Sequence, residues 1–188
     1  CIICMSVVPA MADSTVTTAG TDTVSASEVR TEAKATARFL MDNTDFTDIS
    51  NTSTFYNASR NLILSVRSGY DCSVQADAYL KSVDALLNAD GTLNLENASS
   101  FANDIYSNYA YLLLTLAVLD KDAADYNGIN VVAAFDNIIA NATSDELTNN
   151  LNPYLLGAYY AAIASYKDSL TNADNAVAVT KTALLALC

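Results

Sequence analysis

The residues with the clearest chemical potential in this 188-residue chain form an acidic cluster, Asp120-Lys121-Asp122-Ala123-Ala124-Asp125. Carboxylates at this spacing could bind Ca²⁺, which takes several oxygen ligands. A calcium loop of the EF-hand type beginning at Asp120 would need a central glycine and a final glutamate, but the chain has Asp125 and Val131 there. We therefore expect a turn between two helices, with its carboxylates near the positive end of the second helix.

A second polar loop, NADGTLNLEN at residues 88–97, also contains several oxygen-bearing side chains. They are not in the register of a calcium loop, and Asp90-Gly91 predicts a turn. The chain contains no histidine, so a nucleophilic triad would lack its imidazole base. We therefore expect no catalytic residues, no metal site and no cofactor.

Tyrosine is abundant, with eleven residues against no tryptophan. The candidate ligand-binding residues lie in two apolar segments and are Tyr109, Tyr111, Tyr154, Tyr159 and Tyr160. If their helices line a cavity, the rings and hydroxyls could bind a sugar or another small molecule. The alternative is that these tyrosines simply pack between helices.

The bulk composition indicates one folded domain that does not bind nucleic acid. Apolar residues make up 52% of the chain and charged residues only 16%, with a net charge of −12. A large core is thus possible, whereas phosphate backbones and anionic lipids are repelled. The expected partner is a small molecule, a glycan or a protein.

The start of the chain is typical of secretion. Residues 1–12 are apolar and end in Ala10-Met11-Ala12, a pattern cut by signal peptidase. We interpret them as the remnant of a signal peptide, a lipoprotein anchor at Cys4 being the alternative. The mature chain is expected to lack a transmembrane segment and to be secreted or associated with the cell wall. Cys72 and Cys188 are then expected to be small buried apolar residues.

Residues 13–24 are predicted to be a polar linker, and residues 25–188 a helical domain truncated at its C-terminus. Capping signals and apolar periodicity predict about seven helices and almost no strand. A helix opened by Ser25 and Glu28 comes first, and Thr171 and Asp174 are expected to open the last. The others are expected at about 53–67, 74–88, 99–119, 130–142 and 153–170.

A weak internal repeat relates these helices. A shift of 52 positions places Leu62 on Leu114 and Tyr79 on Val131, and a shift near 45 places Tyr109 on Tyr154. Each unit is an apolar helix, a loop bearing Asp or Asn, and an amphipathic helix. Stacked hairpins of this kind predict a helical solenoid or a closed αα barrel, although a chance alignment of helices would give the same pattern.

The segment LLLTLAVLDKDAADYNGINVVAAFDNI, residues 112–138, resembles the α/α-toroid superfamily of terpenoid cyclases and protein prenyltransferases. It is more similar to the toroid-like domains of secreted bacterial surface proteins, relatives of the helical domain of cobalamin carriers. In these domains an apolar helix ends in a short loop, here 120–122, followed by an Asp-x-x-Gly turn, here 125–128. The chain departs from the pattern at Asp120, where glycine is expected. The resemblance covers residues 53–188 and implies a partial α/α toroid.

Because the superfamily that this segment resembles includes enzymes, the resemblance implies that this chain could be one. Prenyltransferases of this fold hold zinc with a histidine that this chain lacks, and the acidic cluster does not have the D-x-D-D spacing of class II terpene cyclases. Polysaccharide lyases with this fold also use histidine. We therefore expect a non-catalytic module for adhesion, ligand binding or scaffolding. A small-ligand domain of the cobalamin or glycan type is the first alternative, and an enzyme of the terpenoid-cyclase type the second.

Overall fold

The structure is a computed structural model that describes residues 16–17, 23–98 and 104–187. Its described residues form an all-α domain of eight α-helices. These are α2 Ala26–Asp42, α3 Thr52–Arg67, α4 Ser73–Leu86, α5 Ile105–Val118, α6 Val131–Ile139, α7 Ser144–Asn150, α8 Pro153–Ser165 and α9 Ala173–Ala186. A 3₁₀ turn, η2 at Lys167–Ser169, follows α8. The predicted fold class, all-α, is confirmed.

The predicted N-terminal segments lie largely outside this description. The proposed signal-peptide remnant at 1–12, with Cys4, is outside it, as is Cys188. Within the predicted linker, the two-residue strands β1 (Val16–Thr17) and β2 (Thr23–Val24) pair antiparallel. No helix in the described part of the chain is long and apolar enough to cross a membrane.

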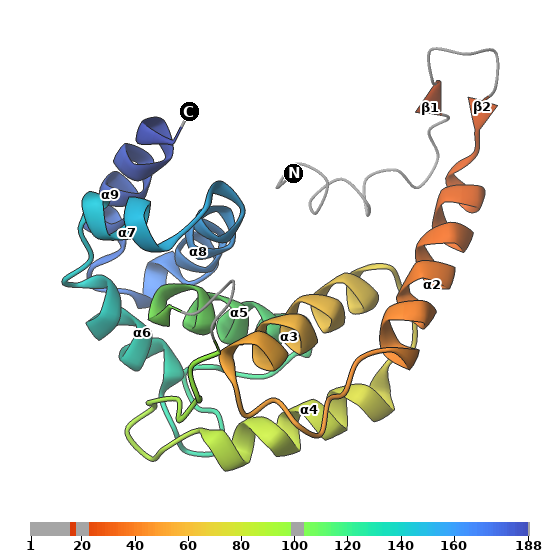
Figure 1. Cartoon of the computed structure of the whole chain (residues 1–188), viewed down its shortest axis with the longest axis horizontal. Coiled ribbons are helices and arrows are strands. Elements are labelled where there is room, and N and C mark those ends of the chain that lie inside the picture. Colours follow the sequence, from red (N-terminus) through yellow and green to blue (C-terminus); the bar gives the residue numbers. More distant parts are fainter. Residues whose placement is uncertain (1–15, 18–22, 99–103, 188) are drawn as a thin grey trace.

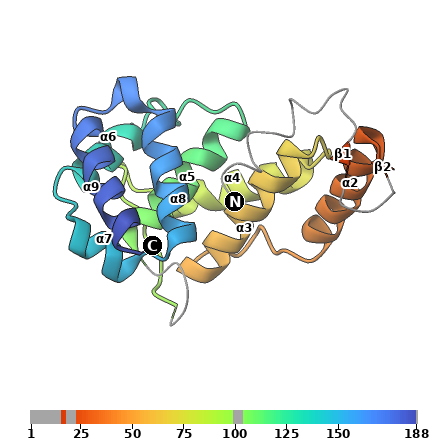
Figure 2. The same cartoon turned by 90° about the horizontal axis from the view of Figure 1, so that it is seen from above.

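The helices follow one another from one end of the molecule to the other (Figure 1). Helix α2 and the strand pair stand at one end, and α7, α8 and α9 gather at the other. The view from above shows the same order, with α3, α4 and α5 between the two ends (Figure 2). Helix α2 therefore has few neighbours, and it packs mainly against α3.

Helices α3, α5 and α8 form the centre of the domain. Helix α5 packs extensively against α3 on one side and α8 on the other. It is buried over most of its circumference, as its apolar sequence predicts, and Leu112, Leu113 and Leu116 are fully buried. Each of the three packs against a later helix of the chain: α4 on α3, α6 on α5 and α9 on α8.

Local sequence signals explain where most helices begin. Ser25 and Glu28 form a reciprocal capping box at α2, and the Asn51 side chain accepts two backbone N–H groups at α3. At α8, Asn152 caps a helix whose first residue is Pro153. Each cap satisfies N–H groups that have no partner inside the helix. The predicted starts at Ser25 and Pro153 are confirmed, whereas the cap at Asn51 was not predicted.

Helix α3 ends at Arg67, the predicted residue, and a glycine follows two positions later. Gly69 adopts a φ of +75°, and the N–H of Tyr70 donates to the carbonyl of Ser65 at 3.2 Å. This is the C-terminal arrangement that a left-handed glycine permits. The predicted α4, with its buried residues Tyr79 and Val83, is also confirmed.

Several predicted boundaries were wrong. Helix α5 begins after Asp104 and not near Ser99, because the extended backbone of Asp104 makes it the N-cap. Helices α6 and α8 end earlier than predicted, at Ile139 and Ser165. Helix α7 was not predicted, although Thr143 caps it by accepting the N–H of Glu146.

The predicted capping box at Thr171 and Asp174 was also wrong. The N-cap of α9 is Asn172, and its side chain does not cap its own helix. Its backbone N–H instead donates to Oδ1 of Asp136 on α6 at 2.9 Å, and its amide donates to Oδ2 at 3.2 Å. A carboxylate from another hairpin therefore determines this helix start, because hydrogen bonds to a charged acceptor are stronger than neutral ones.

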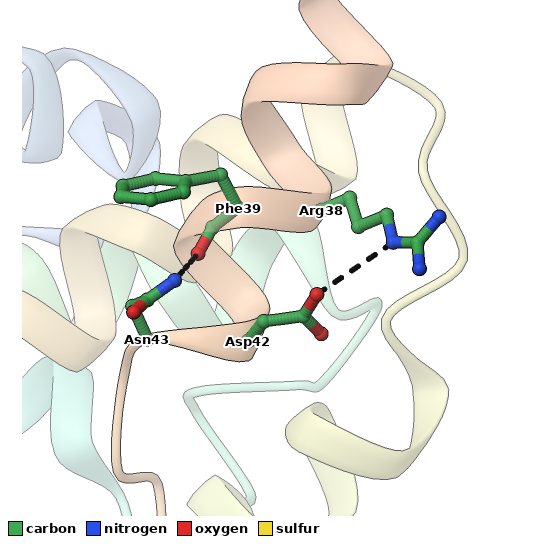
Figure 3. Close-up of polar contacts among 4 residues, drawn as sticks. All are labelled: Arg38, Phe39, Asp42 and Asn43. Carbon is green, nitrogen blue, oxygen red and sulfur yellow. Dashed lines mark hydrogen bonds and ion pairs between the residues drawn. The ribbon is translucent and has the colours of Figure 1, made fainter.

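The C-terminal end of α2 shows how little this helix is covered. Asn43 closes it by donating its side-chain amide to the carbonyl of Phe39 at 2.8 Å, and Arg38 pairs with Asp42 at 3.6 Å (Figure 3). Both partners of this ion pair are largely exposed, so it adds little stability. The Phe39 ring is 64% exposed, whereas Met41 faces the core.

The predicted turn at Asp90-Gly91 joins the first hairpin to the second. Gly91 has a φ of +82°, and its carbonyl accepts the hydroxyl of Tyr109 at 2.7 Å. A Cβ at this position would lie 2.8 Å from the Cβ of Ala134 on α6. Glycine is thus required here both for its backbone conformation and for the close approach of α6.

We expect Gly91→Ala to lower the free energy of unfolding by about 2 to 5 kcal/mol. A left-handed conformation costs an alanine about 1 to 2 kcal/mol, and overpacking adds about 1 to 3 kcal/mol. Urea unfolding followed by circular dichroism measures the change. Gly128→Ala is the matched control, because Gly128 has the same φ of +82° and nothing within 4 Å of its added Cβ. Equal losses in the two variants would contradict the close approach.

Candidate functional site

Three tyrosines from three different helices meet where α3, α5 and α8 come together. The rings of Tyr56 on α3 and Tyr111 on α5 contact edge to face, with centroids 4.9 Å apart. Tyr154, in the first turn of α8, is close enough to both to influence their ionisation. We call Tyr56, Tyr111 and Tyr154 the tyrosine cluster. Tyr56 and Tyr111 are buried, whereas Tyr154 is 41% exposed.

A cation lies beside the tyrosine cluster. The guanidinium carbon of Arg60 is 5.5 Å from the centroid of the Tyr56 ring, within the range of a cation–π interaction. Its Nε and Nη2 atoms donate to Oδ1 of Asn61 at 3.3 and 3.1 Å. These contacts hold the guanidinium in place, and Arg60 itself is only half-buried.

Two of the predicted ligand-binding residues, Tyr111 and Tyr154, are therefore brought together, and the other three are not. Tyr109 is buried and donates its hydroxyl to Gly91, as described above. Tyr159 is fully buried, with its ring edge to face against Phe135 at 5.8 Å. Tyr160 lies at the surface of α8 and is 38% exposed. For Tyr109 and Tyr159 the packing alternative describes the observed contacts.

Burial raises the pKa of the two buried tyrosines of the cluster. It raises the pKa of Tyr111, and the neighbouring Tyr56 and Tyr154 hydroxyls raise it further. Burial also raises the pKa of Tyr56, as does Tyr154, although Arg60 acts in the opposite direction. At neutral pH the Tyr56 and Tyr111 hydroxyls are therefore neutral, and each can both donate and accept a hydrogen bond.

The acidic cluster is a turn, as predicted. Asp120 adopts a φ of +53°, and the next N–H, that of Lys121, donates to the carbonyl of Leu116 at 2.9 Å. Asp120 thus occupies the left-handed position after a helix that usually belongs to glycine. Asp122 accepts the N–H of Ala124 at 2.9 Å, and the carboxylates of 120, 122 and 125 are exposed.

The carboxylates do not cap the following helix, contrary to the prediction. The side chain of Asn130 accepts the N–H of Ala133 at 2.8 Å. The carbonyl of Ala123 accepts the N–H of Val131 at 2.9 Å. These neutral acceptors already satisfy the first turn of α6, so the carboxylates remain in solvent.

A shallow pocket of about 260 Å³ lies between this turn and α4. The hydroxyl of Tyr126 and the amide of Asn127 both donate to Oδ1 of Asp84, at 2.7 and 2.9 Å. The lining also includes Lys121, Asp122 and Asp125. Among the described residues, no group of three or more acidic, cysteine or histidine side chains could hold a metal ion.

A smaller and more apolar pocket, of about 200 Å³, lies at the N-terminal ends of α3 and α5. We call it the α3–α5 pocket. It is lined by Thr52, Thr92, Leu93, Leu95, Asn97, Asp104, Ile105, Asn108 and Tyr109. Of the predicted ligand-binding residues only Tyr109 lines it.

Sequence reasoning missed Tyr56 and Arg60 at the tyrosine cluster, and Asp104 and Asn108 in the α3–α5 pocket. Each pair has a spacing of four residues, which places both members on one face of a helix. An aromatic residue followed by arginine at this spacing was a usable signal, as was a carboxylate followed by an amide. Tyr154 and Tyr111 are brought together by the packing of α8 against α5. No local sequence pattern predicts which helices will pack together.

We expect the free energy of unfolding to fall as the pH rises above about 10, where tyrosines of the unfolded chain lose their protons. Burial raises the pKa of Tyr106 to about 12, helped by its hydrogen bond to Glu146. The folded state therefore holds protons that the unfolded state has released, and its stability falls with rising pH. Each such tyrosine contributes up to about 1.4 kcal/mol per pH unit.

Urea unfolding between pH 8 and 12 measures this slope. Tyr106→Phe should make it shallower, because the variant lacks the hydroxyl whose pKa burial raises. Titration of all tyrosines of the folded protein in a single step near pH 10, followed by absorbance, would contradict the expectation.

Comparisons with known proteins give no family assignment. No protein-family model, no curated protein and no solved structure matches this chain. The structure shows an all-α domain with eight helices in its described residues.

Proposed function

We propose that this chain is a non-catalytic helical module of a secreted or cell-wall-associated protein that binds a glycan at the tyrosine cluster. One observation carries the proposal: Tyr56, Tyr111 and Tyr154 come from three helices and meet beside Arg60. Because Tyr154 is partly exposed, a ligand can reach the cluster from solvent.

The chemistry of the cluster suits a sugar. A sugar ring has apolar C–H faces and hydroxyl edges, and a tyrosine has an apolar ring and a polar hydroxyl. The Arg60 guanidinium adds hydrogen-bond donors beside the rings. Since Tyr56 and Tyr111 are buried, they lose little side-chain freedom when a ligand binds.

The net charge favours a neutral glycan. With a net charge of −12, the chain repels acidic sugars over long distances. The positive charge of Arg60 acts only close to the tyrosine cluster. The apolar start of the sequence, ending in Ala10-Met11-Ala12, supports secretion, where glycans are the abundant ligands of surface modules.

We further propose that the helices belong to an α/α toroid of the type found in bacterial surface proteins. The adjacent placement of α3, α5 and α8, each followed by an amphipathic helix against it, supports this. In this arrangement α3 and α5 run in the same direction. Thr52 and Asp104 line one pocket near the starts of the two helices, and Tyr56 contacts Tyr111 further along both, about one turn into α3 and two turns into α5. Binding of a cobalamin-like ligand and terpenoid-cyclase-type catalysis remain the alternative functions of such a fold.

We expect Tyr154→Ala to weaken the binding of a neutral oligosaccharide by at least about 10-fold, the loss typical of a central aromatic contact. The ligand is first identified by screening the purified chain against an array of neutral and acidic glycans, and its affinity is then measured by calorimetry. Tyr160→Ala is the matched control, because Tyr160 is on the same helix and similarly exposed, at 38% against 41%.

Equal losses in the two variants would contradict binding at the tyrosine cluster. Absence of any neutral glycan ligand would contradict the glycan proposal. Turnover of a polyprenyl or glycan substrate that is lost in Asp122→Asn or Tyr160→Phe would contradict the non-catalytic role.

A further inference from the structure

The sequence contains a single Asn-Gly pair, Asn127-Gly128, and the structure places it in a tight turn before α6. The N–H of Tyr126 donates to the carbonyl of Ile129, and the N–H of Ile129 donates to the carbonyl of Tyr126, both at 2.9 Å. Asn127 has a φ of +52° and Gly128 a φ of +82°. A turn of type I′ has positive φ at both central residues, and Asn-Gly is its preferred pair.

An asparagine that is followed by glycine is chemically labile. Asparagine is among the thermolabile residues of proteins, because the next backbone nitrogen can attack its side-chain amide carbon. In this turn a bond would form between the Gly128 nitrogen and Cγ of Asn127, while the Cγ–Nδ2 bond breaks. The proton of the Gly128 N–H leaves with the amide nitrogen as ammonia, and the product is a cyclic succinimide. Water then opens the ring and leaves aspartate or isoaspartate.

Three features of the turn favour this reaction. Asn127 and Gly128 are both exposed, so water reaches the side chain. The Gly128 N–H donates to no acceptor in the described residues, so its nitrogen reacts without the loss of a hydrogen bond. Apart from its chain neighbours, nothing lies within 4 Å of a Cβ added to Gly128. A glycine with free space around it can rotate its backbone toward the amide carbon.

The Asp90-Gly91 pair could close the same ring, but the structure protects it. The Gly91 N–H donates to the carbonyl of Asn88 at 2.9 Å. A Cβ at Gly91 would lie 2.8 Å from that of Ala134, so the backbone has little room to rotate. Hydrogen bonds from Thr92 to the Asp90 carboxylate lower its pKa, and an ionised carboxylate resists attack by a nucleophile. We therefore expect the two turns to differ in reactivity.

The side chain that would change connects two parts of the fold. Nδ2 of Asn127 donates to Oδ1 of Asp84 on α4 at 2.9 Å. A carboxylate at position 127 has no N–H to donate, and it would face the Asp84 carboxylate. The pocket between the turn and α4 is already lined by three carboxylates and one ammonium group. Because like charges at short distance repel, the product would move away from α4.

We propose that Asn127 is a site of spontaneous deamidation, and that the carboxylate formed there breaks the bond between the turn and α4. Water is the one co-reactant, and no electrons are gained or lost. Each molecule thus loses this connection as it ages. The inference does not depend on the proposed glycan site, because the reaction takes place in a different part of the molecule.

The test is incubation of the purified full chain at mildly alkaline pH, with proteolysis and peptide sequencing by mass spectrometry at successive times. Position 127 should show the mass change of NH₂ replaced by OH. Asn141 is the internal control, because it is also exposed in a turn but is followed by Ala142, whose N–H donates to Ile139 at 3.3 Å. Asn127 should react at least about 10-fold faster than Asn141, because glycine rotates more freely than alanine.

The effect on the fold is measured with Asn127→Asp, which has the main-chain structure of one product. Its midpoint of urea unfolding should lie below that of the unchanged chain. Asn141→Asp makes the same change in net charge at a side chain without a hydrogen bond in the described residues, and should shift the midpoint less. In the Asp84→Asn background, Asn127→Asp should no longer lower the midpoint, because an amide at position 84 can donate to the new carboxylate.

Two results would overturn the proposal. The first is deamidation of Asn127 that is no faster than that of Asn141 in the folded chain. The second is a loss of stability in Asn127→Asp that is no larger than in Asn141→Asp, or that is unchanged in the Asp84→Asn background. Either part of the second result would mean that the new carboxylate does not act through the bond to α4.

Discussion

The burial of α5 between α3 and α8 is the constraint on which the other features of this protein depend. Leu112, Leu113 and Leu116 fill the space around α5, so no face of the helix is left to solvent over its central turns. Any polar side chain on α5 must then find a partner inside the protein. Thr115 does so by donating to the carbonyl of Tyr111 at 2.6 Å, and Tyr109 by reaching Gly91.

Both candidate sites are consequences of this burial. At the tyrosine cluster, α5 presents Tyr111 to the neighbouring helices, so hydroxyl groups from three elements meet at the edge of the core. At the start of α5, Asp104 and Asn108 lie where the helix first enters the core. Here the packing is incomplete and leaves the α3–α5 pocket. The same helix therefore has a filled interface along most of its length and an unfilled one at its N-terminal end.

The sequence predicted the elements of this fold better than their contacts. Apolar periodicity and the caps at Ser25 and Asn152 located most helices, because these signals act within a few residues. Helix α7 was not predicted because Leu147 is its one buried residue. A single apolar residue gives no helical periodicity in the sequence. The start of α9 was misplaced because its carboxylate partner, Asp136, comes from a different hairpin. The site could be predicted only in part for the same reason: Tyr111 and Tyr154 meet through a helix crossing that no local pattern encodes.

The bonds from Tyr126 and Asn127 to Asp84 have a consequence for how the domain comes apart. They join the turn of the second hairpin to the outer helix of the first, across more than forty positions of sequence. Loss of structure that starts at the thinly covered α2 therefore cannot free α4 alone, because α4 is bonded through Asp84 to the turn that precedes α6.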